Sequence, residues 1–232
     1  AVMGPNSRDL LARLSPADFS NEAFPFGTLQ QIEIGYGMAH ALRVTYVGEL
    51  GWELYIPTEF VGPIFDELEK EGRDLGLRFA GYHALDSLRS EKGYRHWGHD
   101  ISPADTPFEA GLGFAVDLKT KGNFIGRAAL EAGKSRPLTR RLVHFRMQQP
   151  RPVLFHDEPV YRDGRIVGRL TSGSYGYSIG AAVGMGYVEC ADGVTADFVE
   201  RGAYEIEIAA ERFPALASLR PFYDPASARV RM

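Results

Sequence analysis

The chain has 232 residues, a formal net charge of −4 and 44% hydrophobic residues. This hydrophobic share is that of a globular protein, and no apolar run in the sequence reaches the roughly 20 residues that a membrane-spanning helix needs. The acidic balance disfavours a nucleic-acid-binding surface, and the single cysteine, Cys190, excludes an internal disulfide and a zinc site built from several thiolates. We therefore expect a folded protein with no membrane and no nucleic-acid partner.

The first part of the chain predicts a mixture of helices and strands. The sequence opens AVMGP, with neither an initiator Met nor a signal peptide, so we expect it to begin within a longer protein. Hydrophobic periodicity and turn residues predict helices over 8–14, 58–75 and 82–92, a strand over 32–34 and a strand–turn–strand over 41–56. The stretch 94–113 is irregular, and its length indicates an ordered, functional segment.

The second part predicts a β module. The polar stretch 131–137 is the best linker candidate in the chain, and short strand-like runs follow it, separated by Gly-containing turns. The runs are 141–147, 159–162, 165–171, 182–188 and 204–208. Their number and spacing favour a small all-β barrel or sandwich. The sequence thus predicts an α+β fold, with one domain over 1–133 and a second over 134–232.

The stretch YVGELGWE at 46–53 is the most informative candidate site. If Gly48 to Gly51 form a four-residue loop, Tyr46 lies opposite Glu53 on the same face of a hairpin. A ring beside a carboxylate suits a flat heterocycle that carries N–H donors, because the carboxylate accepts hydrogen bonds while the ring covers one face. The alternative is an exposed Tyr–Glu pair on an edge strand, and spacing alone favours this alternative.

Two further polar groups are weaker candidates. Arg89 follows Asp86 by three residues, which favours a surface ion pair over a guanidinium that reaches into a cleft. His96, His99 and Asp100 lie within five residues of a loop, with no distant partner evident, so a hydrogen-bonding loop is favoured over a metal site. We assign no metal ligand in this chain.

Six blocks in order resemble the family of the glycine cleavage T-protein, the tetrahydrofolate-dependent aminomethyltransferases. The blocks are MGPNSR at 3–8, YVGELGWE at 46–53, DSLR at 86–89, DI at 100–101 with TPFEAGL at 106–112, FIG at 124–126, and TSG at 171–173 with GYV at 186–188. The resemblance implies an aminomethyltransferase-type folate-binding domain, lacking its N-terminal part, followed by a small C-terminal β-barrel. It also implies that Tyr46 lies beside the folate, that Glu53 holds the pterin ring and that Arg89 lines the folate site.

Further segments resemble the folate-binding C-terminal half of sarcosine and dimethylglycine dehydrogenases. They are EKGYRHW at 91–97, SYGYSI at 174–179 and PFYDP at 221–225, and the tail from Asp197 onward favours the sarcosine type. This resemblance implies that tetrahydrofolate captures, as 5,10-methylenetetrahydrofolate, the one-carbon unit released from an N-methyl amine. FAD would lie on the protein's own N-terminal flavin domain, outside this chain. The implied compartment is the bacterial cytoplasm or, in a eukaryote, the mitochondrial matrix.

The family's catalytic aspartate lies before the MGPNSR block, and hence before Ala1, so we assign no catalytic residue in this chain. The longer protein is expected to be an enzyme, and the resemblance leaves the activity of 1–232 alone open. A flavin-independent aminomethyltransferase or demethylase is the first alternative. The second is a non-catalytic scaffold of the same fold, which the absence of a cysteine from 91–98 disfavours in its iron–sulfur form.

Overall fold

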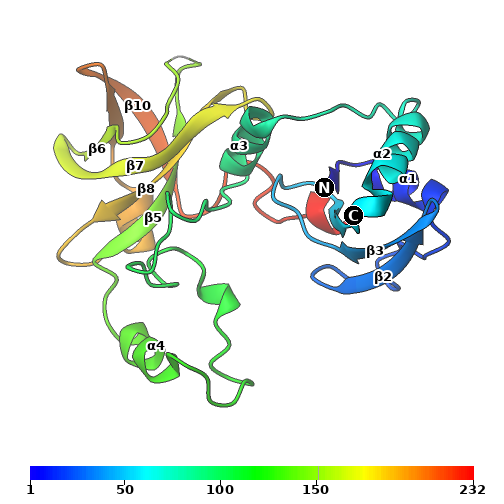
Figure 1. Cartoon of the computed structure of the whole chain (residues 1–232). Coiled ribbons are helices and arrows are strands. Elements are labelled where there is room, and N and C mark those ends of the chain that lie inside the picture. The colour runs from blue at the N-terminus through cyan, green and yellow to red at the C-terminus, as the bar shows by residue number, and fades with distance from the viewer. Residues whose placement is uncertain (151) are drawn as a thin grey trace. The chain divides into compact units, whose positions relative to one another are not determined.

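The computed structural model describes residues 1–150 and 152–232, which form two compact units (Figure 1). We call residues 1–88 with 224–232 the sheet unit, and residues 89–223 the barrel unit. Helix α3 (Tyr82–Glu91) begins in the first and ends in the second. None of the helices in the described ranges is long and apolar enough to cross a membrane.

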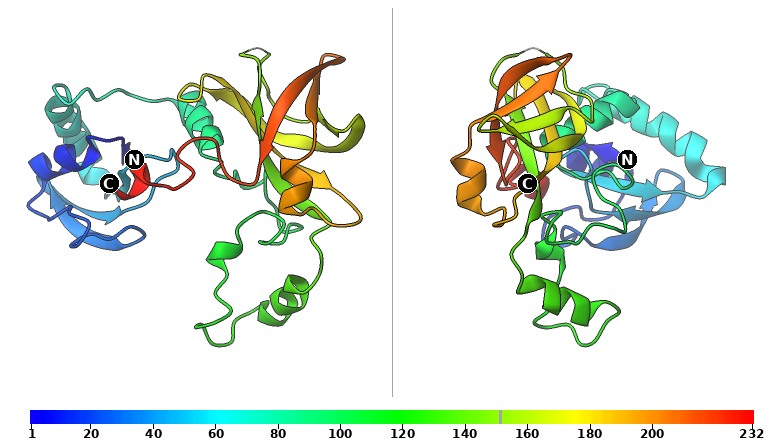
Figure 2. Two further views of the ribbon diagram at one scale, coloured as in Figure 1. Left: turned by 180° about the vertical axis from the view of Figure 1, so that it is seen from behind. Right: turned by 90° about the vertical axis from the view of Figure 1, so that its left-hand side faces the viewer.

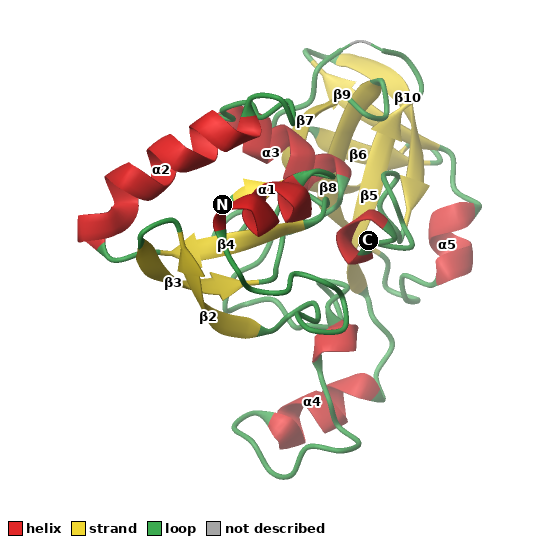
Figure 3. Ribbon diagram, turned by 90° about the vertical axis from the view of Figure 1, so that its right-hand side faces the viewer, coloured by secondary structure: helices red, strands yellow, loops and turns green. Residues whose placement is uncertain are grey.

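In the sheet unit, two helices cover one face of a four-stranded antiparallel sheet of order β1-β4-β3-β2 (Figure 3). The elements are β1 (Val2–Met3), α1 (Ser7–Leu14), β2 (Leu29–Ile34), β3 (Gly37–Leu42), β4 (Gly51–Tyr55) and α2 (Thr58–Gly72). Alternation along β2 buries Ile32 and Ile34 in the core, where Trp52 packs edge-on against Phe19 at a centroid distance of 5.3 Å. The buried face of the sheet therefore meets the helices, and its other face carries polar side chains together with apolar ones such as Leu29.

The strand–turn–strand predicted over 41–56 is wrong in its register. The strand β3 ends at Leu42, and Leu42, not Tyr46, pairs with Glu53. After β3, the backbone of Arg43 bonds to Gly27 and Thr28, beside the start of β2, and β4 begins only at Gly51. There Gly51 pairs with β1, and a Cβ at this position would lie 2.5 Å from Met3 Cγ. The strand on its second edge thus fixes where β4 starts, which the local pattern could not show.

Two sequence predictions about helices also need correction. The helix α2 ends at Gly72 instead of 75, and of three apolar residues at helical spacing along it, Ile64 is buried, whereas Val61 and Phe65 are exposed. The predicted linker at 131–137 is helical over its first four residues, because α4 spans Arg127–Lys134.

The barrel unit is built on a closed six-stranded barrel of order β10-β5-β8-β7-β6-β9 (Figure 2), which confirms the predicted α+β class with a small β-barrel. Its strands are β5 (Arg140–Met147), β6 (Pro159–Arg162), β7 (Arg165–Gly176), β8 (Ala181–Glu189), β9 (Tyr204–Ile208) and β10 (Glu211–Ser218). Apolar side chains, among them Phe145, Leu170 and Ile206, fill its core. The sequence did not predict β10, and α5 (Ala196–Glu200) was also missed.

The segment before the first barrel strand packs on the outside of the barrel. Leu142 N donates to Glu109 O at 2.8 Å, and Arg140 Nη1 lies 2.6 Å from Asp105 Oδ1. The compact units consequently divide at 88/89 and 223/224, and not at the predicted domain boundary 133/134, because long-range contacts attach residues 89–139 to the barrel. The domain boundary itself stays a prediction about the family's modules.

Candidate functional site

Glu53 projects from the face of the sheet that the helices leave uncovered. Along β4, Trp52 is fully buried and Leu54 packs against the core, so Glu53 and Tyr55 point the other way. The Tyr55 hydroxyl donates to Glu53 Oε2 at 2.8 Å, and this hydrogen bond to the carboxylate raises the pKa of Tyr55. One carboxylate oxygen is thereby oriented, while Oε1 has no partner within the described residues.

Apolar surface lies directly beside this carboxylate. Leu42 is the cross-strand partner of Glu53, and Leu29 is the partner of Leu42 on the next strand. Leu29 is 54% exposed, and Leu42 is partly buried. Side chains directly opposite each other across antiparallel strands lie within contact distance. A half-buried carboxylate can accept hydrogen bonds from the edge of a flat heterocycle, and the partly buried Leu42 beside it can pack against the face of that ring.

Tyr46 lies in the irregular connection between β3 and β4, and not on a strand. The connection 43–50 is held at its last residue, where Leu50 O accepts from Gly4 N at 2.7 Å and from Ser7 Oγ at 3.1 Å, and it contains a local turn in which Thr45 Oγ1 accepts from Val47 N at 3.2 Å. Tyr46 itself is half-buried. The structure therefore places Tyr46 and Glu53 in the same unit, on adjoining segments, without the facing pair that spacing predicted.

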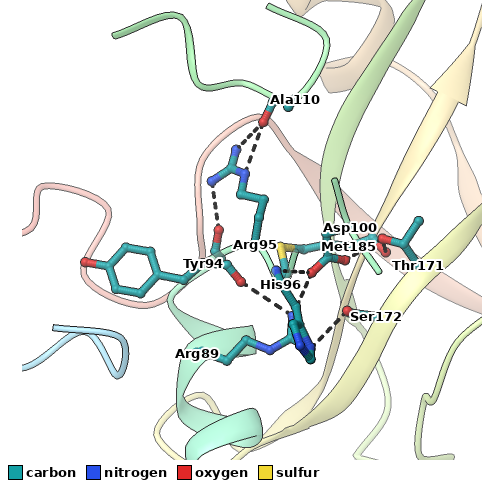
Figure 4. A network of polar contacts seen from close by, with 10 residues as sticks. Arg89, Tyr94, Arg95, His96, Asp100, Ala110, Thr171, Ser172 and Met185 are labelled. Carbon is teal, nitrogen blue, oxygen red and sulfur yellow. Dashed lines mark hydrogen bonds and ion pairs between the residues drawn. The ribbon is translucent and has the colours of Figure 1, made fainter. Parts of the chain in front are cut away.

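Arg89 belongs to the barrel unit and is buried in a polar network (Figure 4). Its Nη1 lies 2.8 Å from Asp100 Oδ2, and its Nη2 donates to Ser172 Oγ at 3.0 Å. Asp100 also accepts from His96 N at 2.8 Å and from Thr171 Oγ1 at 2.5 Å, so both of its oxygens are engaged. An arginine and aspartate buried together fix the segment that carries them to the barrel strand.

The loop that contains His96, His99 and Asp100 is part of this network. The rings of His96 and His99 are tilted by 36° to each other with centroids 4.5 Å apart, and Asp100 is the loop residue that Arg89 binds. Among the described residues, no cluster of three or more His, Cys, Asp or Glu side chains is arranged for a metal ion. The hydrogen-bonding interpretation of this loop agrees with these contacts.

Sequence reasoning missed Tyr55 and Leu42 as neighbours of Glu53. Tyr55 could have been found, because residues two apart on a strand share a face. Leu42 could not have been found from spacing, since its position opposite Glu53 depends on the long connection 43–50. The structure brings Tyr46 and Glu53 into the sheet unit and Arg89 into the barrel unit.

Comparisons with known proteins agree on one family. The model of the GCVT N-terminal domain matches residues 1–120, and that of the glycine cleavage T-protein C-terminal barrel domain matches residues 140–224. A 4-methylaminobutanoate oxidase (formaldehyde-forming) of Paenarthrobacter nicotinovorans is 47% identical over 99% of this chain. The mitochondrial sarcosine dehydrogenase of Mus musculus is 40% identical over the whole chain. The chain spans 27% and 25% of the lengths of these two relatives.

A solved structure supports the matches to the two family models. The crystal structure of glycine cleavage system aminomethyltransferase T from Bartonella henselae superimposes with a TM-score of 0.72 at 28% identity, over 91% of this chain and 55% of that protein. The first family model alone covers more than half of the chain. The two family models match in succession along the chain, and the closed barrel and the solved structure agree with them, so the chain belongs to the glycine cleavage T-protein family.

Proposed function

We propose that this chain is the tetrahydrofolate-binding part of an enzyme that demethylates an N-methyl amino acid by oxidation, and that the folate accepts the one-carbon unit. The observation that carries the proposal is the Glu53 site: a half-buried carboxylate, oriented through one oxygen by Tyr55 and paired across the strands with Leu42, beyond which Leu29 lies on the next strand. A pterin has N–H donors along one edge and two flat faces. The Glu53 carboxylate accepts hydrogen bonds and the pterin edge donates them, so the protein and the ligand are complementary.

Within this site we assign a role to each chain residue. Glu53 would accept hydrogen bonds from the pterin edge, and Tyr55 would keep the carboxylate in the accepting orientation. Tyr46 would cover the ring from the connection 43–50. Bound tetrahydrofolate would supply the amine nitrogens that take up the one-carbon unit as 5,10-methylenetetrahydrofolate. No residue of 1–232 is assigned to proton transfer.

The contribution of Arg89 is proposed to be indirect. The sequence resemblance implies that Arg89 lines the folate site, but this residue is only 3% exposed and its guanidinium binds Asp100, Ser172 and the Tyr94 carbonyl. Such a group has little surface to offer a ligand. We infer that Arg89 acts by holding the loop that contains Asp100 against the barrel.

The substrate class comes from the relatives. The names of both relatives denote enzymes of N-methylated amino acids, 4-methylaminobutanoate and sarcosine, and one name describes a formaldehyde-forming oxidase. We propose the same substrate class here, with FAD on a flavin domain outside residues 1–232. Free formaldehyde as the product is the outcome that would argue against capture by folate.

The test is tetrahydrofolate binding by the full-length protein and by its Glu53→Gln variant, measured by titration calorimetry. Loss of a charged acceptor is expected to weaken binding by about 2–3 kcal/mol, or about 30- to 150-fold. Glu33→Gln is the matched control, because Glu33 is exposed on β2 of the same sheet. Equal affinities of the unmodified protein and Glu53→Gln would remove Glu53 from the site.

A flavin-independent aminomethyltransferase is the second candidate. The supporting observation is coverage: this chain spans 55% of the aminomethyltransferase structure but only about a quarter of the two oxidoreductase relatives. The visible absorption spectrum of the full-length protein separates the two functions. A flavin spectrum that is bleached by an N-methyl amino acid supports the demethylating enzyme, and a protein without flavin supports the transferase.

A further inference from the structure

We propose that Arg229 is a positioning residue of the folate site, acting through Glu49 on the connection that carries Tyr46. This inference rests on the proposed function and concerns the same site. Its basis is the segment Asp224–Met232, which we call the return segment because the chain comes back in it from the barrel unit to the sheet unit. All of the contacts that follow lie within the sheet unit.

The connection 43–50 lies outside the strand pairing of the sheet. Its residues 46–50 are bends without strand pairing, and Gly48 has a φ of +78°, so no β-ladder fixes Tyr46. The bonds from Gly4 and Ser7 hold only its last carbonyl, that of Leu50. Between these points lies Glu49, whose side chain is only 16% exposed.

The return segment is anchored on both sides of Arg229. On one side, Asp224 accepts from Ala228 N at 2.9 Å and from Arg229 N at 3.2 Å. On the other side, Val230 is buried at 3% exposure, and Met232 O accepts from Arg8 Nη2 at 2.5 Å. The backbone at Arg229 is therefore held in place before its side chain makes any contact.

From this backbone Arg229 reaches the connection. Its Nη1 lies 3.6 Å from Glu49 Oε2, and the two side chains are 51% and 16% exposed. The carboxylate lies three residues after Tyr46, in the bend that leads to β4 and Glu53. A fixed cation at this point restricts the conformations of the bend, and so reduces the ordering cost that folate binding must overcome.

The expected effect is moderate, because the pair is partly exposed. Removal of one partner of such a pair changes an equilibrium by about 2- to 5-fold. In the full-length protein, Arg229→Ala is expected to raise the dissociation constant for tetrahydrofolate by this factor and to leave kcat at saturating folate unchanged. Arg229→Lys should restore part of the affinity, since the charge is retained.

Two measurements separate positioning from a general loss of structure. Hydrogen exchange of the ligand-free protein should show faster exchange at the amides of Val47–Leu50 in Arg229→Ala, with the barrel strands unchanged. The double variant with Glu49→Gln should bind folate no more weakly than Arg229→Ala alone, because both changes remove the same interaction. Arg201→Ala, which removes an exposed ion pair with Asp197 in the barrel unit, is the control.

The outcomes are distinguishable from those of the proposed function. Unchanged affinity or unchanged exchange at Val47–Leu50 in Arg229→Ala, together with weakened binding by Glu53→Gln, would overturn the role of Arg229 alone. Additive losses in the double variant would overturn it as well. No effect of Glu53→Gln would instead contradict the folate site on which the inference rests.

Discussion

Glu53 in the sheet unit and Asp100 in the barrel unit are both carboxylates beside a strand, but their surroundings differ. Glu53 is half-buried and accepts from Tyr55 with one oxygen, which leaves the other available to a ligand. Asp100 is buried, and Arg89, His96 and Thr171 use both of its oxygens. The first carboxylate can therefore bind a ligand, and the second can only hold the structure together.

Other buried polar groups of the barrel unit differ from the proposed folate residues in the same way. In the barrel unit, buried Glu91 accepts from both the backbone and the hydroxyl of Ser178, and buried His144 packs against Gly93. In the sheet unit, the proposed folate residues lie on an uncovered sheet face and on a bend. The buried polar groups of the barrel unit bond to one another and to the backbone, so we expect ligand binding at the accessible carboxylate of Glu53.

The largest expected effect tests this contrast directly. Asp100→Ala leaves the buried Arg89 guanidinium without its counter-ion, and we expect the free energy of unfolding to fall by about 3–5 kcal/mol. Urea-induced unfolding followed by circular dichroism measures it. Glu53→Gln is the comparison variant, and its unfolding free energy should change by less than about 0.5 kcal/mol. Similar losses in both variants would show that Glu53 is structural too.

The next effect tests how tightly the barrel unit is packed at the end of α3. Gly93 has a φ of +71°, and a Cβ there would lie 2.5 Å from His144 Cε1 and 3.1 Å from Pro221 Cβ. Gly93→Ala is expected to destabilise by about 2–4 kcal/mol, through left-handed strain and overpacking together. In Gly126→Ala, where φ is +90° and the space is open, only the strain of about 1–2 kcal/mol should remain. Equal losses at both positions would exclude a packing contribution.

The smallest effect is a pH dependence that belongs to the barrel unit. Burial, with the nearby charge of Arg95, lowers the pKa of His144 from 6.5 to about 3. The unfolded chain therefore binds a proton between pH 6.5 and 3 that the folded chain does not, so stability falls as pH drops through this window. We expect the unfolding free energy to be about 2 kcal/mol lower at pH 5 than at pH 7 from this group alone.

Replacement of His144 isolates that contribution from those of other titrating groups. The difference in unfolding free energy between the unmodified protein and His144→Gln should vary with pH over this window. A difference that stays constant from pH 5 to pH 7 would contradict the burial of a neutral imidazole.

Much of the barrel could be predicted from sequence, because its strands carry their own pattern. Alternating apolar residues separated by Gly-containing turns predicted β9 at its observed bounds, and β5 and β8 within one residue at each end. The strand β10 was missed because it contains Pro214 and because the turn before it is formed by Ala209 and Ala210, both with positive φ. Such a turn without glycine gives no signal in a sequence.

The candidate site was also predicted only in part from the sequence. The six ordered blocks indicated the family that the comparisons then showed, and this resemblance, rather than the spacing of the residues, implied roles for Tyr46, Glu53 and Arg89. Spacing could not show that Leu42 faces Glu53, or that Arg89 is buried against Asp100. The two residues of each pair are 11 positions apart in the sequence, and the segment between them forms neither a regular hairpin nor one continuous helix.

By itself, the sequence determined the family, the α+β class and the barrel, because these follow from local periodicity and from the order of short motifs along the chain. Only the tertiary structure decided which polar residues are accessible. Exposure depends on what packs against a side chain, and that is set by β1 at the edge of β4, by the loop that carries Asp100 and by the return segment. The 232 residues thus combine a barrel locked by buried charges with a sheet face whose carboxylate is accessible to a ligand.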